Sequence, residues 1–212
     1  MAERTTGLRA ALSNPRIYMG FQRLLAARSS NERFLADHLK PRPGERILDI
    51  GCGPARILSY LPEVFYFGID ISPRYVAAAR REHGDRGEFH CMDIRESQPP
   101  QREFDAVLIK GLIHHFDDAD ADLLLRIAAH SMRDLGRMVA IENAYVEGQS
   151  RIARWIINRD RGVYVRTPQA YAQLAKRYFA VVEYTIREDL MRIPYTHLIL
   201  ECREPRRGGA VD

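Results

Sequence analysis

Little in this chain of 212 residues points to a disulfide-stabilised module, a zinc protein or a membrane protein. It has only three cysteines, and Cys52, Cys91 and Cys202 show no Cys-x-x-Cys spacing, which favours neither a zinc site nor a disulfide framework. No apolar run approaches the roughly 20 residues of a membrane span. The first residues lack the apolar core of a signal peptide. We therefore expect a cytoplasmic protein without a membrane span and without a metal site.

Charge of one sign is also scarce, because the net charge is only +4 at pH 7. The arginines are spread along the chain except for a group between residues 151 and 166, and no signature of an RNA-binding module accompanies them. Hydrophobic residues make up 46% and charged residues 28%, as in ordinary globular proteins. This composition favours a small-molecule partner over nucleic acid.

Strand-like and helix-like segments alternate along most of the chain, which predicts an α/β fold with a parallel sheet. The strand-like runs are short and apolar, as expected for strands that are buried on both faces. These runs lie at 46–50, 65–69, 87–91, 104–109 and 136–142, and the helix-like stretches lie at 54–61, 73–83 and 118–134.

The two ends of the chain depart from this alternation. Ser29-Ser30-Asn31-Glu32 is typical of a capping box that opens a helix to about Leu39. Near the other end, strand-like runs at 180–187 and 195–202 follow a helix that starts at Thr167-Pro168. The link between these two runs is too short for a crossover helix, so they should pair antiparallel. We expect five parallel strands plus a C-terminal antiparallel hairpin.

The segment from Leu48 to Arg56 carries the most informative motif. An apolar run leads into Asp49 and then into a Gly51-x-Gly53 turn, after which a helix-compatible stretch follows. Glycines in such a turn let the backbone approach a ligand closely, because no Cβ blocks the way. A fixed carboxylate is unfavourable beside a phosphate but favourable beside an ammonium or sulfonium group. The motif therefore favours a positively charged ligand over a dinucleotide.

Two later segments fit the same kind of site. Asp70 ends the second strand-like run, 19 residues beyond Gly51, where an acidic residue in such folds reaches ribose hydroxyls. The fourth run is followed by Lys110 and, four residues later, by His114 and His115. In open parallel sheets the active site lies beyond the carboxyl ends of the strands. A histidine there has the right pKa range to accept a proton from a reacting group.

Taken in this order, the motifs resemble those of class I S-adenosylmethionine-dependent methyltransferases of the small-molecule type, which includes ubiquinone and menaquinone biosynthesis enzymes. The similarity spans about residues 15–202, and its motifs lie within 46–116. The resemblance implies a Rossmann-like seven-stranded sheet flanked by helices and S-adenosyl-L-methionine as cofactor. Ala55 stands where the family often has a third glycine. The residues that the resemblance assigns to the cofactor are Asp49, Gly51, Cys52, Gly53, Asp70, Ile71, Met92, Asp93, Ile94 and Lys110.

The resemblance also implies catalytic residues. His115 stands where phosphoethanolamine methyltransferases use a catalytic histidine, His114 is a second candidate, and Tyr18 is a candidate partner from N-terminal lid helices within residues 1–40. In the alternative interpretation, one histidine packs and the other caps. The methyltransferase core would span 41–204, followed by a flexible tail at 205–212.

Within the core, residues 144–167 are expected to select the methyl acceptor. Trp155, Tyr164 and several arginines there suit an aromatic or acidic small molecule. Two other functions stay open. A nicotinamide-dependent oxidoreductase would share the strand-turn-helix, although Arg56 stands where its fingerprint needs a glycine. A cofactor-binding subunit without catalytic activity would carry the same motifs. The protein is expected to be a monomer or a homodimer.

Overall fold

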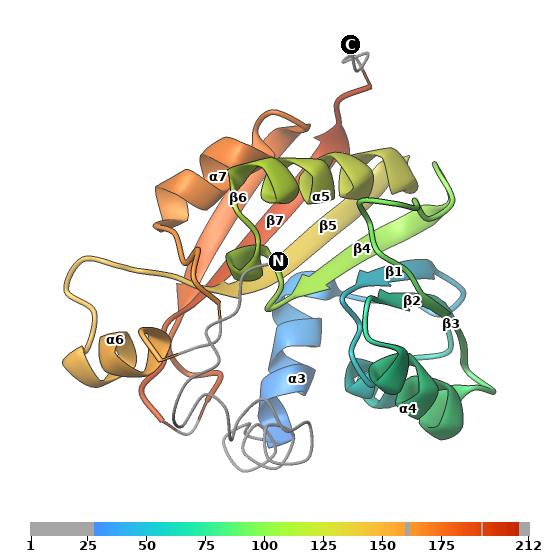
Figure 1. Cartoon of the computed structure of the whole chain (residues 1–212), viewed down its shortest axis with the longest axis horizontal. Helices are drawn as coiled ribbons and strands as arrows, with labels where there is room; N and C mark the ends of the chain where they lie inside the picture. Colours follow the sequence, from blue (N-terminus) through green and yellow to red (C-terminus); the bar gives the residue numbers. More distant parts are fainter. Residues whose placement is uncertain (1–27, 160–161, 192, 208–212) are drawn as a thin grey trace.

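A computed structural model of the chain describes residues 28–159, 162–191 and 193–207. Its centre is a seven-stranded sheet with the order β3-β2-β1-β4-β5-β7-β6 (Figure 1). Strands β1 to β5 are parallel to one another, and β7 runs antiparallel to both β5 and β6. The predicted parallel sheet with a closing antiparallel hairpin is confirmed. The strands are β1 (Arg46–Ile50), β2 (Phe65–Asp70), β3 (Gly87–Cys91), β4 (Phe104–Lys110), β5 (Met132–Asn143), β6 (Phe179–Arg187) and β7 (His197–Pro205).

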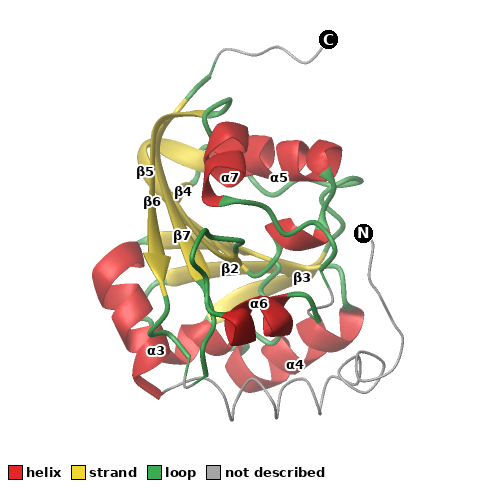
Figure 2. Cartoon of the chain, turned by 90° about the vertical axis from the view of Figure 1, so that its left-hand side faces the viewer, coloured by secondary structure: helices red, strands yellow, loops and turns green. Residues whose placement is uncertain are grey.

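Helices cover both faces of this sheet, as Figure 2 shows in a view turned by 90°. Side chains alternate between the two faces along each strand. In β1, Leu48 and Ile50 join the core cluster that includes helices α5 and α7, whereas Ile47 joins the cluster of α3, η1 and α4. The fold is therefore a three-layer α/β/α arrangement. Its helices are α3 (Arg28–Phe34), η1 (Leu35–Leu39), η2 (Arg56–Tyr60), α4 (Pro73–His83), η3 (Ile113–His115), α5 (Asp118–Ser131), α6 (Arg151–Ile157) and α7 (Pro168–Ala175).

Several helices begin with side-chain caps. The Ser72 hydroxyl accepts a hydrogen bond from the Tyr75 N–H, and the Asp117 carboxylate accepts one from the Asp120 N–H. The capping box expected at Ser29 is wrong, because Ser29 lies inside α3 and not before its first turn. The helix expected at 54–61 is reduced to a short 3₁₀ helix, η2, since Ala55 at its start is left-handed.

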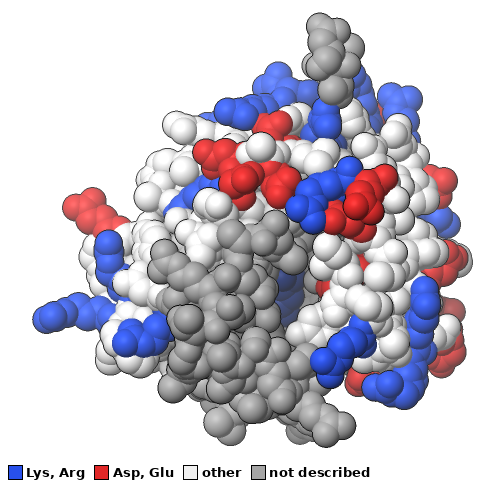
Figure 3. All heavy atoms as spheres, viewed as in Figure 1, with Lys and Arg blue, Asp and Glu red and all other residues white. Residues whose placement is uncertain are grey.

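The surface carries basic and acidic side chains close together. In Figure 3 they lie next to one another at the upper and right-hand sides of the view. Two such pairs are Arg177–Asp122 at 2.7 Å and Arg207–Asp134 at 2.8 Å. Arg206 also donates its backbone N–H to the Tyr178 carbonyl, so both residues just after β7 are hydrogen-bonded. Over the described ranges, no helix has the length and apolar character needed to cross a membrane.

The topology determines where a site can form. The parallel strands β1 to β5 all end at the same edge of the sheet, and the strand order reverses between β1 and β4. Loops on either side of such a reversal diverge and leave a crevice. The residues that follow β1, β2, β3, β4 and β5 therefore line one region of the molecule.

Candidate functional site

The turn after β1 adopts the backbone conformation that its glycines permit. Gly51 has φ +77° and Gly53 has φ +55°, both in the left-handed region. The N–H groups of Gly51 and Cys52 donate to the Ile69 carbonyl at 2.8 and 3.0 Å, which holds the turn against β2. A Cβ built on Gly53 would meet no atom within 4 Å. The turn thus presents bare backbone to open space beyond the strand ends.

Ala55 takes the conformation of the glycine that it replaces. It is left-handed, with φ +52°, and is fully buried. This conformation costs a residue with a Cβ about 1–2 kcal/mol. Residues 51, 53 and 55 are thus all left-handed. Glycine adopts this conformation freely, whereas at Ala55 the surrounding packing must stabilise it.

Asp49 is a buried carboxylate at the base of this turn. It is 2% exposed, and its Oδ2 accepts a 2.5 Å hydrogen bond from the Tyr66 hydroxyl on β2. Its Oδ1 is buried and has no hydrogen-bond partner among the residues that the structure describes. Burial raises the pKa of Asp49 to about 7, although the Tyr66 hydrogen bond opposes this shift. A buried acceptor without a partner is costly in a folded protein, so it marks a position where a ligand would supply the missing donor or positive charge.

Asp70 lies on the other side of the turn, at the end of β2. Its Oδ2 accepts from the Gly53 N–H at 2.9 Å and its Oδ1 from the Ser72 N–H at 2.8 Å. Burial raises its pKa, and the two N–H groups oppose that shift. Each carboxylate oxygen has a second lone pair, so Asp70 keeps the capacity to accept from a ligand hydroxyl.

Asp93 follows β3 and is turned toward a basic neighbour. Arg95 donates from Nε to its Oδ1 at 2.9 Å and from Nη2 to its Oδ2 at 2.5 Å. These hydrogen bonds from Arg95 lower the Asp93 pKa. Next to it, Ile94 is buried and Met92 packs against the same core cluster. The Met92 N–H donates to the Asp70 carbonyl at 3.1 Å, which brings the ends of β2 and β3 together.

Lys110, at the end of β4, contacts the N-terminal segment. Its Nζ donates to Asn31 Oδ1 at 2.7 Å and lies 5.9 Å from the centre of the Phe34 ring. The described part of the expected lid, α3 and η1, thus packs on the sheet and touches the same edge as the glycine turn. Tyr18, the other catalytic candidate from this segment, lies outside the described residues.

Glu142, near the end of β5, binds the loop that carries both histidines. It is 1% exposed. Its Oε1 accepts from the N–H groups of Leu112 and Ile113, both at 2.8 Å. Its Oε2 accepts from the His114 N–H at 3.4 Å and from His114 Nδ1 at 2.5 Å. A carboxylate only accepts, so Nδ1 of His114 carries the proton in this pair.

His114 is enclosed on its other sides as well. Its carbonyl accepts from the Tyr164 N–H at 3.0 Å. A Cβ on Gly162 would lie 2.0 Å from His114 Cδ2, so only glycine fits against this ring. The ring of His115 lies 4.3 Å from that of His114, centre to centre. His114 therefore links three segments of the chain, and His115 is buried beside it, with 8% of its surface exposed.

A second group of polar residues lies beside Glu142. Asn143 Nδ2 donates to the Tyr195 hydroxyl at 3.1 Å, and the Tyr195 ring lies 4.8 Å from that of His197. Burial lowers the pKa of His197 to about 4, so this imidazole is neutral near pH 7. Its Nδ1 has no hydrogen-bond partner within the described ranges. The end of β5 and the start of β7 thus contribute neutral polar groups to the edge of the sheet where the His114–His115 loop lies.

Two of the arginines expected to select an acidic acceptor contact other parts of the described structure. Arg166 binds Asp118 at 2.7 Å and donates to the Phe116 carbonyl at 2.9 Å. Arg159 stacks on the exposed Trp155 ring at 3.8 Å. Across the described ranges, no group of three or more His, Cys, Asp or Glu side chains is arranged to hold a metal ion.

Glu142 and Tyr66 are the functional residues that sequence reasoning missed. Tyr66 stands in a short strand-like run, where an aromatic residue is ordinary. Glu142 follows four buried residues of β5, at the end of a strand that is buried there on both faces. A charged residue at the end of such a run is the one signal that could have drawn attention to it, because an ionised side chain is rarely buried without partners.

Comparison with known proteins agrees with this geometry. Residues 47–136 match the family described as "Methyltransferase domain". The 27-O-demethylrifamycin SV methyltransferase of Amycolatopsis mediterranei is 35% identical over 112 residues, 49% of this chain and 40% of that protein. The aklanonic acid methyltransferase DauC of a Streptomyces species is 38% identical over 85 residues, 36% of this chain and 39% of that protein. The chain thus spans about two fifths of the length of these relatives.

A solved structure extends the likeness over nearly the whole fold. Phosphoethanolamine N-methyltransferase 2 of Haemonchus contortus, in complex with phosphomonomethylethanolamine and S-adenosylhomocysteine, superposes with a TM-score of 0.74 at 15% identity. The superposition covers 94% of this chain and 59% of that one. The narrower resemblance to ubiquinone and menaquinone enzymes stays a prediction. Residues 47–136 therefore carry a methyltransferase domain, within a fold that is shared with a solved N-methyltransferase structure.

Proposed function

We propose that this protein transfers the methyl group of S-adenosylmethionine to an oxygen, nitrogen or carbon atom of a small-molecule acceptor. One observation carries the proposal: a bare glycine turn lies between two carboxylates, of which Asp49 has a buried oxygen without a partner. A ligand with positive charge and hydroxyl groups satisfies both carboxylates, which a phosphate does not. The family match over residues 47–136 supports the same donor.

The residues present fit the cofactor. Asp49, Gly51, Cys52 and Gly53 would hold its methionine part, and Asp70 with Ile71 would hold the ribose. Met92, Asp93 and Ile94 would hold the adenine, and Lys110 would face the carboxylate. When bound, S-adenosylmethionine supplies an electrophilic methyl group on a positively charged sulfonium.

The chain's own residues would align the acceptor, exclude water and remove a proton. Alignment of two reactants accounts for much of the rate enhancement in a direct transfer of this kind. We assign proton removal to His115, because His114 is held by Glu142, Gly162 and Tyr164 while His115 lies against it. His114 is then a positioning residue. The sequence offered both histidines as catalytic candidates, and this proposal gives each of them a different role.

The small-molecule acceptor is supported by two relatives, which are methyltransferases named for a demethylrifamycin and for aklanonic acid. The nicotinamide-dependent alternative is not favoured, because Arg56 stands at its third glycine position and the family match is to methyltransferases.

Calorimetric titration with S-adenosylhomocysteine and with NAD tests the donor. We expect binding of S-adenosylhomocysteine and none of NAD; the opposite pattern would overturn the proposal. A second assay mixes the protein with S-adenosylmethionine and a metabolite extract and measures the S-adenosylhomocysteine formed. A protein that binds the cofactor but forms no product with any extract would be a non-catalytic subunit.

A further inference from the structure

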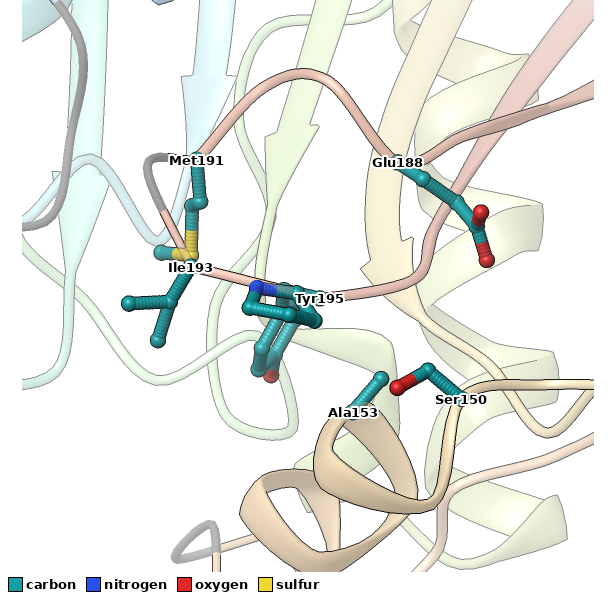
Figure 4. Close-up of a pocket in the computed structure, with 7 residues that line it drawn as sticks. Ser150, Ala153, Glu188, Met191, Ile193 and Tyr195 are labelled. Atoms are coloured by element: carbon teal, nitrogen blue, oxygen red, sulfur yellow. The ribbon is translucent and has the colours of Figure 1, made fainter.

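A hollow of about 350 Å³ lies between the start of α6 and the connection from β6 to β7. Its size is at the lower end of small-molecule sites, which run from about 300 to 1,000 Å³. Figure 4 shows Ser150 and Ala153 facing the connection across this hollow, with the Tyr195 side chain directed toward α6. The residues that line it are Ser150, Ala153, Glu188, Met191, Ile193, Pro194 and Tyr195.

The lining combines apolar and polar surface in about equal parts. Ala153 and the ring of Tyr195 are buried, and the side chains of Met191 and Ile193 are partly buried beside them. An apolar wall that combines aliphatic side chains with one aromatic ring fits a flat hydrocarbon or aromatic body.

Glu188 is the charged side chain among the lining residues. Its Oε1 accepts a hydrogen bond from the Thr196 hydroxyl at 3.3 Å, and no described cation forms an ion pair with it. The neighbouring Arg187 points elsewhere, to Asp37 and Asp189. The hollow therefore has negative charge at its rim, which attracts a cation and repels an anion.

The hollow is also connected to the site beyond the strand ends. Tyr195 lines it, and the Tyr195 hydroxyl accepts from Asn143 Nδ2 at 3.1 Å. Asn143 directly follows Glu142, which holds the His114–His115 loop. Asn143 pairs with His197 at the start of β7, so the hollow lies at the same edge of the sheet as the His114–His115 loop.

We infer that this hollow binds the apolar or aromatic body of the methyl acceptor, and that Glu188 selects acceptors whose polar group is neutral or cationic. This inference rests on the proposed methyl transfer and specifies its substrate. It favours the aromatic acceptor expected from the sequence over the acidic one.

Three probes of nearly equal shape test the inference: 2-phenylethylamine, 2-phenylethanol and phenylacetate. Each is titrated into the full chain saturated with S-adenosylhomocysteine, and binding is followed by NMR chemical shifts. We expect the amine to bind on the order of fivefold more tightly than phenylacetate, as one exposed charge a few ångströms away allows. The alcohol should fall between them.

Two variants locate the binding. Glu188→Gln should bring the amine and phenylacetate to equal affinity, whereas the control Glu183→Gln, at an exposed glutamate of β6 paired with Arg203, should leave the difference unchanged. Ala153→Phe should fill the hollow and abolish binding of all three probes. Circular dichroism and S-adenosylhomocysteine affinity check that each variant is folded.

The outcomes separate the two proposals. If the chain fails to bind S-adenosylhomocysteine, the proposed function is wrong and this inference falls with it. If S-adenosylhomocysteine binds but the probes do not, or bind with equal affinity, the inference alone is wrong. The inference is also refuted if the folded Ala153→Phe variant still binds the probes. If Ala153→Phe does not fold, the effect of Glu188→Gln on the difference in affinity between the amine and phenylacetate tests the inference instead.

Discussion

Replacing Glu142 with glutamine is the sharpest test of the buried hydrogen-bond network beneath the two histidines. The carboxylate accepts from three backbone N–H groups and from the His114 ring. A glutamine oxygen can still accept from Leu112 and Ile113, but its NH₂ group then faces the His114 donors. Either the Nδ1 proton of His114 loses its acceptor, or the ring changes tautomer.

The expected cost follows from burial. Hydrogen bonds to a charged group contribute about 1.5–3 kcal/mol, and removing one member of a buried ion pair costs about 3–5 kcal/mol. The amide keeps part of the network, so we expect Glu142→Gln to lower the free energy of unfolding by about 2–4 kcal/mol. For a chain of this length that corresponds to a fall in melting temperature of roughly 5–10 °C.

A matched control exists in the same sheet. Glu201 on β7 also faces a histidine, His38, but at 3.3 Å and with its side chain 27% exposed. Glu201→Gln should cost less than about 1 kcal/mol, as for other partly solvated pairs. Urea unfolding of both variants, with ¹⁵N spectra of the His114 ring, measures the difference. Equal costs for the two variants, or a wild-type His114 with its proton on Nε2, would refute this account of the network.

Three further outcomes are expected. Asp70→Ala should weaken S-adenosylhomocysteine binding by about 30–100-fold, the worth of charge-assisted hydrogen bonds of about 2–3 kcal/mol; unchanged affinity in calorimetry would remove Asp70 from the ribose site. His115→Ala should lower turnover by about 10²–10⁴-fold with little change in cofactor affinity, because it would remove only a general base; an unaltered rate would exclude that role. Burial raises the Asp49 pKa from 3.8 to about 7, so between these pH values the folded state binds a proton that the unfolded state does not. The free energy of unfolding without ligand should therefore fall by at most about 4 kcal/mol as the pH rises from about 4 to about 7. Asp49→Asn should flatten that part of the pH profile in urea unfolding, and an equally steep profile in the variant would assign the effect to other groups.

The sequence predicted the features that depend on short segments. Each strand of the parallel sheet is a local apolar run, and Asp49, Gly51 and Gly53 lie within five residues of one another, so pattern and spacing were sufficient. The left-handed backbone at Ala55 was only partly foreseeable, because alanine rarely adopts it unless packing imposes it.

Contacts between distant segments could not be predicted in this way. Glu142 reaches the N–H groups of residues 28 to 30 positions earlier, and Tyr66 reaches Asp49 across 17 positions. Nothing local distinguishes that glutamate from one in a solvated strand end. The separate surroundings of His114 and His115 were equally hidden, since adjacent residues can point into different environments once the chain turns.

The contact between Gly162 and His114 has a consequence for how acceptor preference can change in this protein. The segment after β5 is not a free appendage, because its glycine fits against a ring that Glu142 holds in place. A replacement segment taken from a relative would have to present a residue without a Cβ at this point, or displace the histidine loop that borders the reaction. A chimaera that is designed to change the acceptor preference should therefore keep Gly162. The residues on either side of Gly162 can be varied.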